Sequence, residues 1–208
     1  VYPSGFWNSN KYDFMSGIHP AYKDELLDPY GNLNFGFEEQ IYFQHKPFIK
    51  TDYIGILVDG DLEMVQNSAL SDKRVRQALN FAVDRSRMVR FLRNNAVYAA
   101  GHGFIPKGLK GYEENSSFGF DFNLEKAAEL LVESGFPGGK GIEQIELATT
   151  SDYVDLCEFL QHAWAQIGID VQVEVMPSAV QREKVSRSQV MLFRKSWLAD
   201  YPDAENFL

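Results

Sequence analysis

One stretch of the sequence alternates strand and helix patterns in a way that limits the fold class. Residues 142–148 alternate apolar and polar side chains, residues 153–167 repeat apolar side chains at helical spacing, and residues 170–176 alternate again. Gly168 stands between the helix and the second strand, where helices commonly end. A strand–helix–strand unit of this kind forms a right-handed crossover between parallel strands. The sequence therefore predicts an α/β fold.

The rest of the chain adds elements that agree with this fold class. Residues 51–59 are apolar almost without a break, which predicts a strand covered on both faces. Residues 71–93 predict the longest helix, capped by Ser71 and interrupted near Ser86. The other predicted elements are a short helix at 20–27, strands at 38–43 and 190–193, a glycine-rich loop at 99–123, a helix at 124–134 capped by Asn123, and a helix at 177–186, with Trp197 beyond the last strand.

Charge and cysteine content exclude several functional classes. The chain carries 20 Lys and Arg against 29 Asp and Glu, a net charge of -9, which opposes binding to nucleic-acid phosphates or to an anionic membrane surface. The four histidines lack metal-ligand spacing, so the sequence predicts neither a metal nor a cofactor. The single cysteine, Cys157, excludes an internal disulfide and lies beside an apolar helix stripe, which predicts a buried thiol.

The end of the chain concentrates chemistry that suits a ligand. Residues 194–203 follow an apolar strand and include Arg194, Trp197 and Asp200. In open α/β sheets, ligands bind beyond the ends of strands. An aspartate there suits a cationic ligand group, a tryptophan offers a flat wall, and Tyr201 joins these as a candidate ligand-binding residue. The same spacing also fits a tryptophan at a rim beside an aspartate that caps a turn.

A second interpretation makes the same segment catalytic. Asp200 and Asp203 lie close enough in sequence to act as the acid–base pair of a hydrolase. No nucleophile motif or metal-ligand cluster accompanies them. The residues therefore favour a binding site over a catalytic one.

Three segments resemble one known family. Residues 71–85 (SDKRVRQALNFAVDR) match its helix motif D-x-R-V-R-x-A-L-x-x-A-x-D-R, residues 121–136 resemble its A-x-x-L-L-x-x-A-G helix, and residues 197–203 (WLADYPD) resemble its ligand segment. They occur in the family's order and at roughly its spacing over residues 51–208. The chain is therefore similar to the extracytoplasmic solute-binding proteins of peptide-type ABC transporters, which include dipeptide- and oligopeptide-binding proteins.

The resemblance implies a fold and a domain plan. Family members have two lobes joined by crossing strands that close on a peptide like a clamp. Residues 1–50 match a segment that connects from the first lobe, and residues 51–208 match the second ligand-binding lobe without its C-terminal part. The implied lobe is of the type II periplasmic-binding-protein kind, with a mixed sheet flanked by helices. We expect the chain to be a piece of a longer, monomeric protein, periplasmic or extracellular, and anchored in some members as a lipoprotein.

The resemblance also implies a function and residue roles. It predicts the substrate-binding component of an ABC importer, not an enzyme, with a peptide or similar small solute as ligand and the permease subunits as partners. It implies that Asp200 pairs with the α-ammonium group of the ligand, that Trp197 lies beside the ligand backbone and that Arg194 meets the carboxylate of a short peptide. Val154 stands where some oligopeptide binders have a histidine, so their length preference does not transfer. Nickel chelates, sugars and a role as a solute sensor stay open as alternatives.

Overall fold

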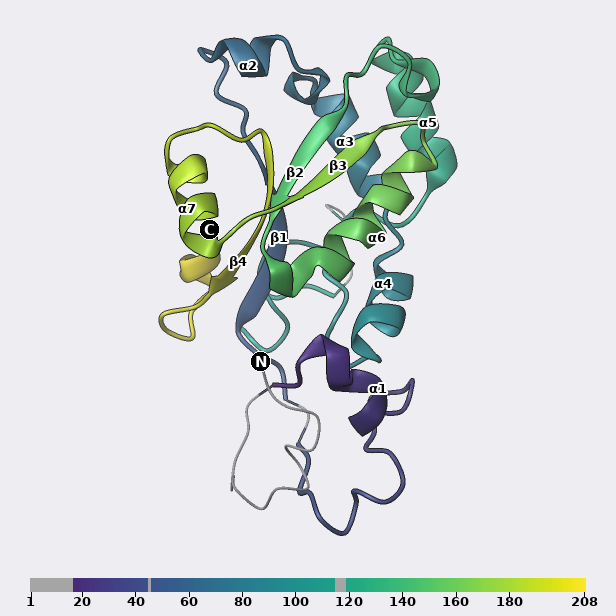
Figure 1. Ribbon diagram of the computed structural model, residues 1–208, viewed down its shortest axis with the longest axis vertical. Helices are drawn as coiled ribbons and strands as arrows, with labels where there is room; N and C mark the ends of the chain where they lie inside the picture. Colours follow the sequence, from purple (N-terminus) through teal and green to yellow (C-terminus); the bar gives the residue numbers. More distant parts are fainter. Residues whose placement is uncertain (1–16, 45, 115–118) are drawn as a thin grey trace. The chain divides into compact units, whose positions relative to one another are not determined.

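The computed structural model contains a four-stranded mixed sheet of order β1-β4-β2-β3 (Figure 1). Strand β1 (Lys50–Ile56) pairs antiparallel with β4 (Leu192–Leu198), whereas β2 (Ile145–Thr149) runs parallel to both β4 and β3 (Val171–Val175). The described residues also form the helices α1 (Lys23–Leu26), α2 (Glu63–Gln66), α3 (Lys73–Phe81), α4 (Arg85–Arg93), α5 (Leu124–Glu133), α6 (Val154–Ala165) and α7 (Ser178–Ser186), with 3-10 turns η1 (Pro20–Tyr22), η2 (Ala69–Ser71), η3 (Pro137–Gly139), η4 (Ser151–Tyr153) and η5 (Ala204–Phe207).

Helices α6 and α7 cover opposite faces of this sheet (Figure 1). On the α6 side, Cys157 is fully buried and contacts Thr149 of β2. On the α7 side, Val185 packs against Ala148 of β2. Leu147 and Ala148, which point to opposite faces, are both fully buried, so β2 is covered on both sides. The predicted α/β fold with a mixed sheet flanked by helices is confirmed, and so is the parallel β2–α6–β3 unit.

Three sequence predictions are wrong in detail. The interruption of the long helix that was expected near Ser86 lies at residues 82–84, between α3 and α4, and Asp72 rather than Ser71 caps α3, because the turn η2 already includes Ser71. Residues 38–40 form a turn and residues 41–43 have no regular structure, instead of the expected strand, since the backbone N–H groups of Gln40 and Ile41 both donate to Phe37 O. Strand β4 continues to Leu198, so Trp197 lies within the strand.

Two predicted local features are confirmed. Asn123 caps α5, and its Oδ1 accepts a hydrogen bond from Lys126 N at 2.9 Å. Cys157 is a buried thiol, and its burial raises the pKa of that thiol. A thiol with a raised pKa carries little reactive thiolate at neutral pH.

The chain divides into two compact units. Unit 1 comprises Val1–Lys46 and Ser86–Ala99, whereas unit 2 comprises Pro47–Arg85 and Ala100–Leu208 and contains the whole sheet. The structure describes residues 17–44, 46–114 and 119–208. The division expected from the family, with a connecting segment up to residue 50 and a ligand-binding lobe after it, stays a prediction.

A buried asparagine organises unit 1. Asn94 accepts a hydrogen bond from Lys23 Nζ at 2.9 Å, and its Nδ2 donates to Asp24 Oδ1 at 3.0 Å and to Leu27 O at 3.1 Å. Its backbone has a φ of 45°, a left-handed conformation that asparagine tolerates better than most residues. This one side chain therefore joins the end of α4 to α1.

Candidate functional site

Strand β4 has an edge that is paired in its first part and open in its last part. Hydrogen bonds from Leu57 N to Met191 O and from Ala199 N to Ile49 O show that the odd-numbered residues of β4 direct their backbone groups toward β1. The even-numbered residues face the other way, where β2 pairs only with Leu192 and Phe193. Within the described part of the chain, the backbone groups of Ser196 and Leu198 on this edge therefore have no strand partner.

Charged side chains cover the α6 side of the β1–β4 ribbon. We call Lys50, Asp52, Tyr153, Arg194 and Ser196 the charged face. Arg194 is only 6 % exposed; its NH2 group donates to Asp52 Oδ1 and, at 2.8 Å, to Ser196 Oγ, and its guanidinium lies over the Tyr153 ring. Lys50 Nζ lies 3.1 Å from Asp52 Oδ1 and 3.1 Å from Tyr153 Oη. These groups form one connected network beside the open edge.

The network changes the acidity of its tyrosine. Burial by itself raises the pKa of Tyr153, but the hydrogen bond from Lys50 and the positive charge of Arg194 outweigh it, and the pKa lies below its usual value. One atom of the network remains unsatisfied: among the described residues, the buried Nε of Arg194 has no hydrogen-bond partner. A buried N–H without an acceptor is costly, so this atom lowers the net stabilisation that the network provides.

Aromatic side chains cover the opposite, α7 side of the same ribbon. We call Tyr53, Phe104, Phe193, Trp197 and Phe207 the aromatic face. The Tyr53 and Phe104 rings meet edge to face with centroids 5.1 Å apart, and the Phe104 and Phe207 centroids are 6.1 Å apart. The Phe193 ring lies directly over Gly55, its partner across the strands, where a β-carbon would collide with the ring. Burial raises the pKa of Tyr53, the opposite direction from Tyr153.

The turn after β4 is organised by Asn206. Its Oδ1 accepts hydrogen bonds from Trp197 Nε1 at 3.1 Å and from the backbone N of Asp200 at 3.0 Å. Asp203 caps η5, because its Oδ1 accepts from Glu205 N at 3.0 Å. The Asp200 carboxylate is exposed and has no polar partner within the residues that the structure describes. The turn thus fixes the backbone of Asp200 and leaves its carboxylate available.

The structure separates the four predicted site residues into two settings. Trp197, Asp200 and Tyr201 are exposed at the end of β4 and in the turn, and Tyr201 Oη donates to Glu205 Oε1 at 2.9 Å. This hydrogen bond raises the pKa of Tyr201. Arg194, in contrast, is buried on the charged face. Their roles toward a ligand stay predictions, while Asp203, the second member of the hydrolase pair, has a structural role as a cap.

Sequence analysis missed the partners of Arg194. Asp52 and Lys50 come from β1, far from Arg194 in sequence, and Tyr153 comes from the turn η4. A signal was available in β1, because Asp52 is the one acidic residue in a strand of otherwise mostly apolar residues. The prediction that β1 is covered on both faces is wrong, because most of its residues are only half-buried and the Asp52 side chain is 38 % exposed. A charge in a partly buried sheet still favours an oppositely charged partner on the neighbouring strand.

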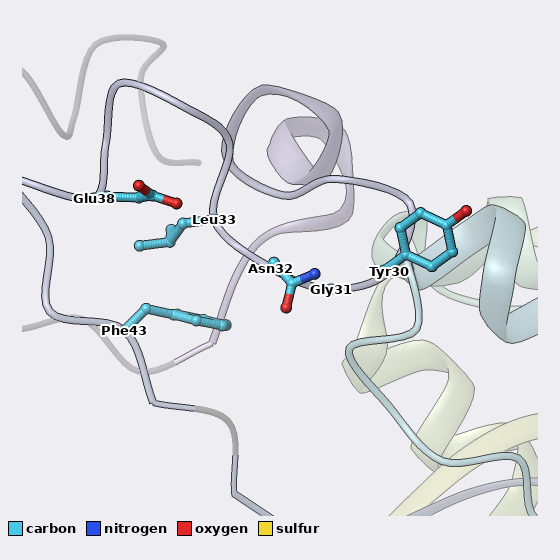
Figure 2. Close-up of a pocket in the computed structure, with 6 residues that line it drawn as sticks. All are labelled: Tyr30, Gly31, Asn32, Leu33, Glu38 and Phe43. Carbon is cyan, nitrogen blue, oxygen red and sulfur yellow. The ribbon is translucent and has the colours of Figure 1, made fainter.

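Unit 1 has a separate, open pocket of about 440 Å³ (Figure 2). Its lining residues are Tyr30, Gly31, Asn32, Leu33, Glu38 and Phe43. It contains none of the predicted site residues, and its one charged group is a carboxylate. The combination of an open strand edge, a charged face and a free carboxylate belongs to unit 2.

The comparison with protein families gives a clear result. The family described as bacterial extracellular solute-binding proteins, family 5 Middle, matches residues 5–208, almost the whole chain. The chain belongs to this family. Family 5 comprises solute-binding proteins of peptide ABC importers, so the predicted family is confirmed, and its members are binding proteins rather than enzymes.

Individual relatives of this family 5 chain have different ligands in their names. It is 25 % identical over 147 residues to the dipeptide-binding protein of Escherichia coli (69 % of this chain and 27 % of the relative), and 26 % identical over 147 residues to heme-binding protein A of Haemophilus influenzae (69 % and 26 %). The structure resembles the periplasmic binding protein DppA of Helicobacter pylori in complex with the peptide STSA, with a TM-score of 0.70 and 22 % identity over 93 % of this chain and 34 % of that one. The chain spans about a quarter of the length of the curated relatives.

Members of the family are extracellular by description. Among the residues that the structure describes, none of the helices combines the length and the apolar character that crossing a membrane requires.

Proposed function

We propose that the protein to which this chain belongs binds peptides in a cleft and delivers them to the membrane subunits of an ABC importer. One observation carries the proposal: the open edge of β4 at Ser196 and Leu198 is followed, two residues later, by the exposed carboxylate of Asp200. An extended peptide can add to an open strand edge through its backbone, which gives affinity without dependence on side-chain sequence.

The four site residues have distinct roles in this proposal. Asp200 accepts hydrogen bonds from the α-ammonium group at the peptide's N-terminus, since an ammonium offers three donors and one charge to a carboxylate. Trp197, which is 41 % exposed on the aromatic face, flanks the peptide backbone on one side, and Tyr201 forms the rim beside Asp200. Arg194 faces the peptide from the charged side of the same strand.

The test is a calorimetric titration of the full-length protein, unfolded and refolded beforehand to remove carried-over ligand. The ligands are a mixture of short peptides and the same mixture acetylated at the N-terminus. We expect the free peptides to bind, and acetylation or the substitution Asp200→Asn to reduce affinity by about 1.5–3 kcal/mol, the range for a hydrogen bond to a charged group.

A matched control keeps this test specific. Asp61 is also an exposed aspartate of unit 2, in the loop after β1, so Asp61→Asn should leave the affinity unchanged. Equal binding of free and acetylated peptides would remove the ammonium contact, and absence of any peptide binding would contradict the proposed function itself.

A second ligand class has a specific observation in its favour. The relative named heme-binding protein A is as similar to this chain as the dipeptide-binding protein is. If neither peptide mixture binds, the same refolded protein should be titrated with heme. Binding of heme alone would keep the protein a solute-binding component and replace the peptide as its ligand.

The remaining features of the proposal concern the whole protein. We infer that it acts as a monomer without catalytic activity, outside the cytoplasmic membrane, with a lipid anchor in the lipoprotein manner.

A further inference from the structure

A buried glutamine of α7 links the two strands β2 and β4. Gln181 is 4 % exposed, and its Nε2 donates to Ala148 O of β2 at 3.0 Å and to Arg194 O of β4 at 2.9 Å. A side-chain amide nitrogen carries two hydrogens, so these two carbonyl groups use both of them. Glutamine is uncommon at a fully buried position, because apolar side chains fill most of these. Its two strand contacts therefore account for its place in the core.

The contacts of Gln181 coincide with the end of the β2–β4 ladder. Within the described residues, β4 pairs with β2 only at Leu192 and Phe193. Arg194 comes next, and its carbonyl, like those of the other even-numbered residues of β4, points away from β1 toward the β2 side. Strand β2 ends at Thr149 and the chain then turns into η4. The side chain of Gln181 thus takes the place that a further strand residue would hold.

This arrangement determines where the open edge begins. A buried backbone carbonyl needs a hydrogen-bond donor, and Gln181 supplies one to the buried Arg194 without adding another strand. Beyond Arg194, the backbone groups of Ser196 and Leu198 on the same edge have no strand partner in the described part of the chain. Helix α7 therefore ends the ladder with a side chain and leaves the following stretch of β4 open.

We propose that Gln181 is a positioning residue for the ligand: by ending the β2–β4 ladder at Arg194, it keeps the edge of β4 open at Ser196 and Leu198 for the backbone of a bound peptide. This inference rests on the proposed peptide-binding function. Without the donors of Gln181, the carbonyl group of Arg194 is left unsatisfied, and β4 has to shift to give it another partner. The shifted edge then loses the alignment that hydrogen bonds to a peptide backbone require.

The experiment compares Gln181→Met with Gln161→Met in the refolded full-length protein, with the mixture of short peptides as ligand. Methionine keeps the length of the side chain and removes its N–H donors. Gln161 of α6 is the matched control, because its Nε2 also donates to a strand carbonyl, Val171 O of β3, on a strand that does not pair with β4. We expect Gln181→Met to lower peptide affinity about tenfold or more, and Gln161→Met to leave it unchanged, although both lower stability against urea.

Amide hydrogen exchange gives a second readout. In the natural protein, we expect peptide to slow exchange at the N–H groups of Ser196 and Leu198, whereas Leu192, already in the ladder, is equally protected with and without peptide. In Gln181→Met, at the same peptide concentration, the protection of Ser196 and Leu198 should be lost.

The outcomes are distinct from one another. Unchanged peptide binding by folded Gln181→Met, an equal loss of affinity in Gln161→Met, or bound peptide that leaves Ser196 and Leu198 unprotected would each overturn the role of Gln181 while peptide binding stands. Gln181→Leu is a second variant in case Gln181→Met does not fold. Failure of the natural protein to bind any peptide would instead overturn the proposed function and the role of Gln181 with it.

Discussion

The two faces of the β1–β4 ribbon are built from the same strands but held in different ways. On the aromatic face, Tyr53, Phe104 and Phe207 pack ring against ring, and stability comes from apolar area removed from water. On the charged face, Asp52 forms ion pairs with both Arg194 and Lys50, so each of these charges is stabilised by a particular partner. Substitutions on the aromatic face are therefore expected to cost stability in proportion to the buried area, whereas on the charged face the cost is expected to depend on which partner remains.

The largest effect should come from the aromatic face. Phe207 is nearly completely buried against Phe104, and Phe207→Ala should lower the free energy of unfolding by about 3 kcal/mol, as for a buried aromatic side chain. Urea unfolding of the full-length protein measures this loss. The lowered pKa of Tyr153 on the charged face should not change, and a shift in its ultraviolet titration would show that the two faces are not independent.

A smaller effect should come from the charged face. Asp52→Ala leaves the buried Arg194 without its counter-ion and should cost about 2 kcal/mol, less than for a fully buried pair because the Asp52 side chain is 38 % exposed. Adding Arg194→Met, which removes the uncompensated charge, should recover part of that loss. A double-mutant cycle from urea unfolding measures the coupling, and strictly additive costs would argue against a mutually dependent pair.

The smallest expected effect is a difference in the pH at which Tyr153 and Tyr53 lose their protons in alkaline solution. The lowered pKa of Tyr153 means that the folded protein releases this proton before the unfolded chain does, so stability rises as pH increases from its folded pKa to the ordinary value near 10. The raised pKa of Tyr53 has the opposite sign, and stability falls as pH rises above 10. Ultraviolet difference titrations of Tyr153→Phe and Tyr53→Phe should show that Tyr153 ionises first; the reverse order would contradict the contrast between the faces.

Local patterns predicted the framework of the fold. The alternation at 142–148 and 170–176 became β2 and β3, and Asn123 caps its helix as its residue type predicts. Strand β4 was predicted too short because Arg194 and Lys195 interrupt its apolar run, which is typical of a strand end. In the fold these residues stay within the strand, because Asp52 and Tyr153 compensate Arg194.

The site was only partly predictable for the same reason. Trp197, Asp200 and Tyr201 follow one another in sequence, so a motif could indicate them as a group. The setting of Arg194 depends on Asp52, which is 142 positions away in sequence. The turn that fixes Asp200 depends on Asn206, which no spacing rule distinguishes from other polar residues. A specific hydrogen-bond partner, rather than any residue's own propensity, decides both cases: it lies 142 positions away for Arg194 and six positions away for Asp200.

The open edge of β4 also bears on how this protein avoids self-association. Unpaired strand edges invite pairing with other chains, and natural proteins protect them by keeping them short and flanking them with charge. Here the free backbone groups are confined to Ser196 and Leu198, with Arg194 before them and the Asp200 carboxylate after them. Such an edge is too short to template a growing sheet. This part of β4 can therefore stay exposed without offering a long template, whereas the outer edges of the sheet are formed by β1 and β3.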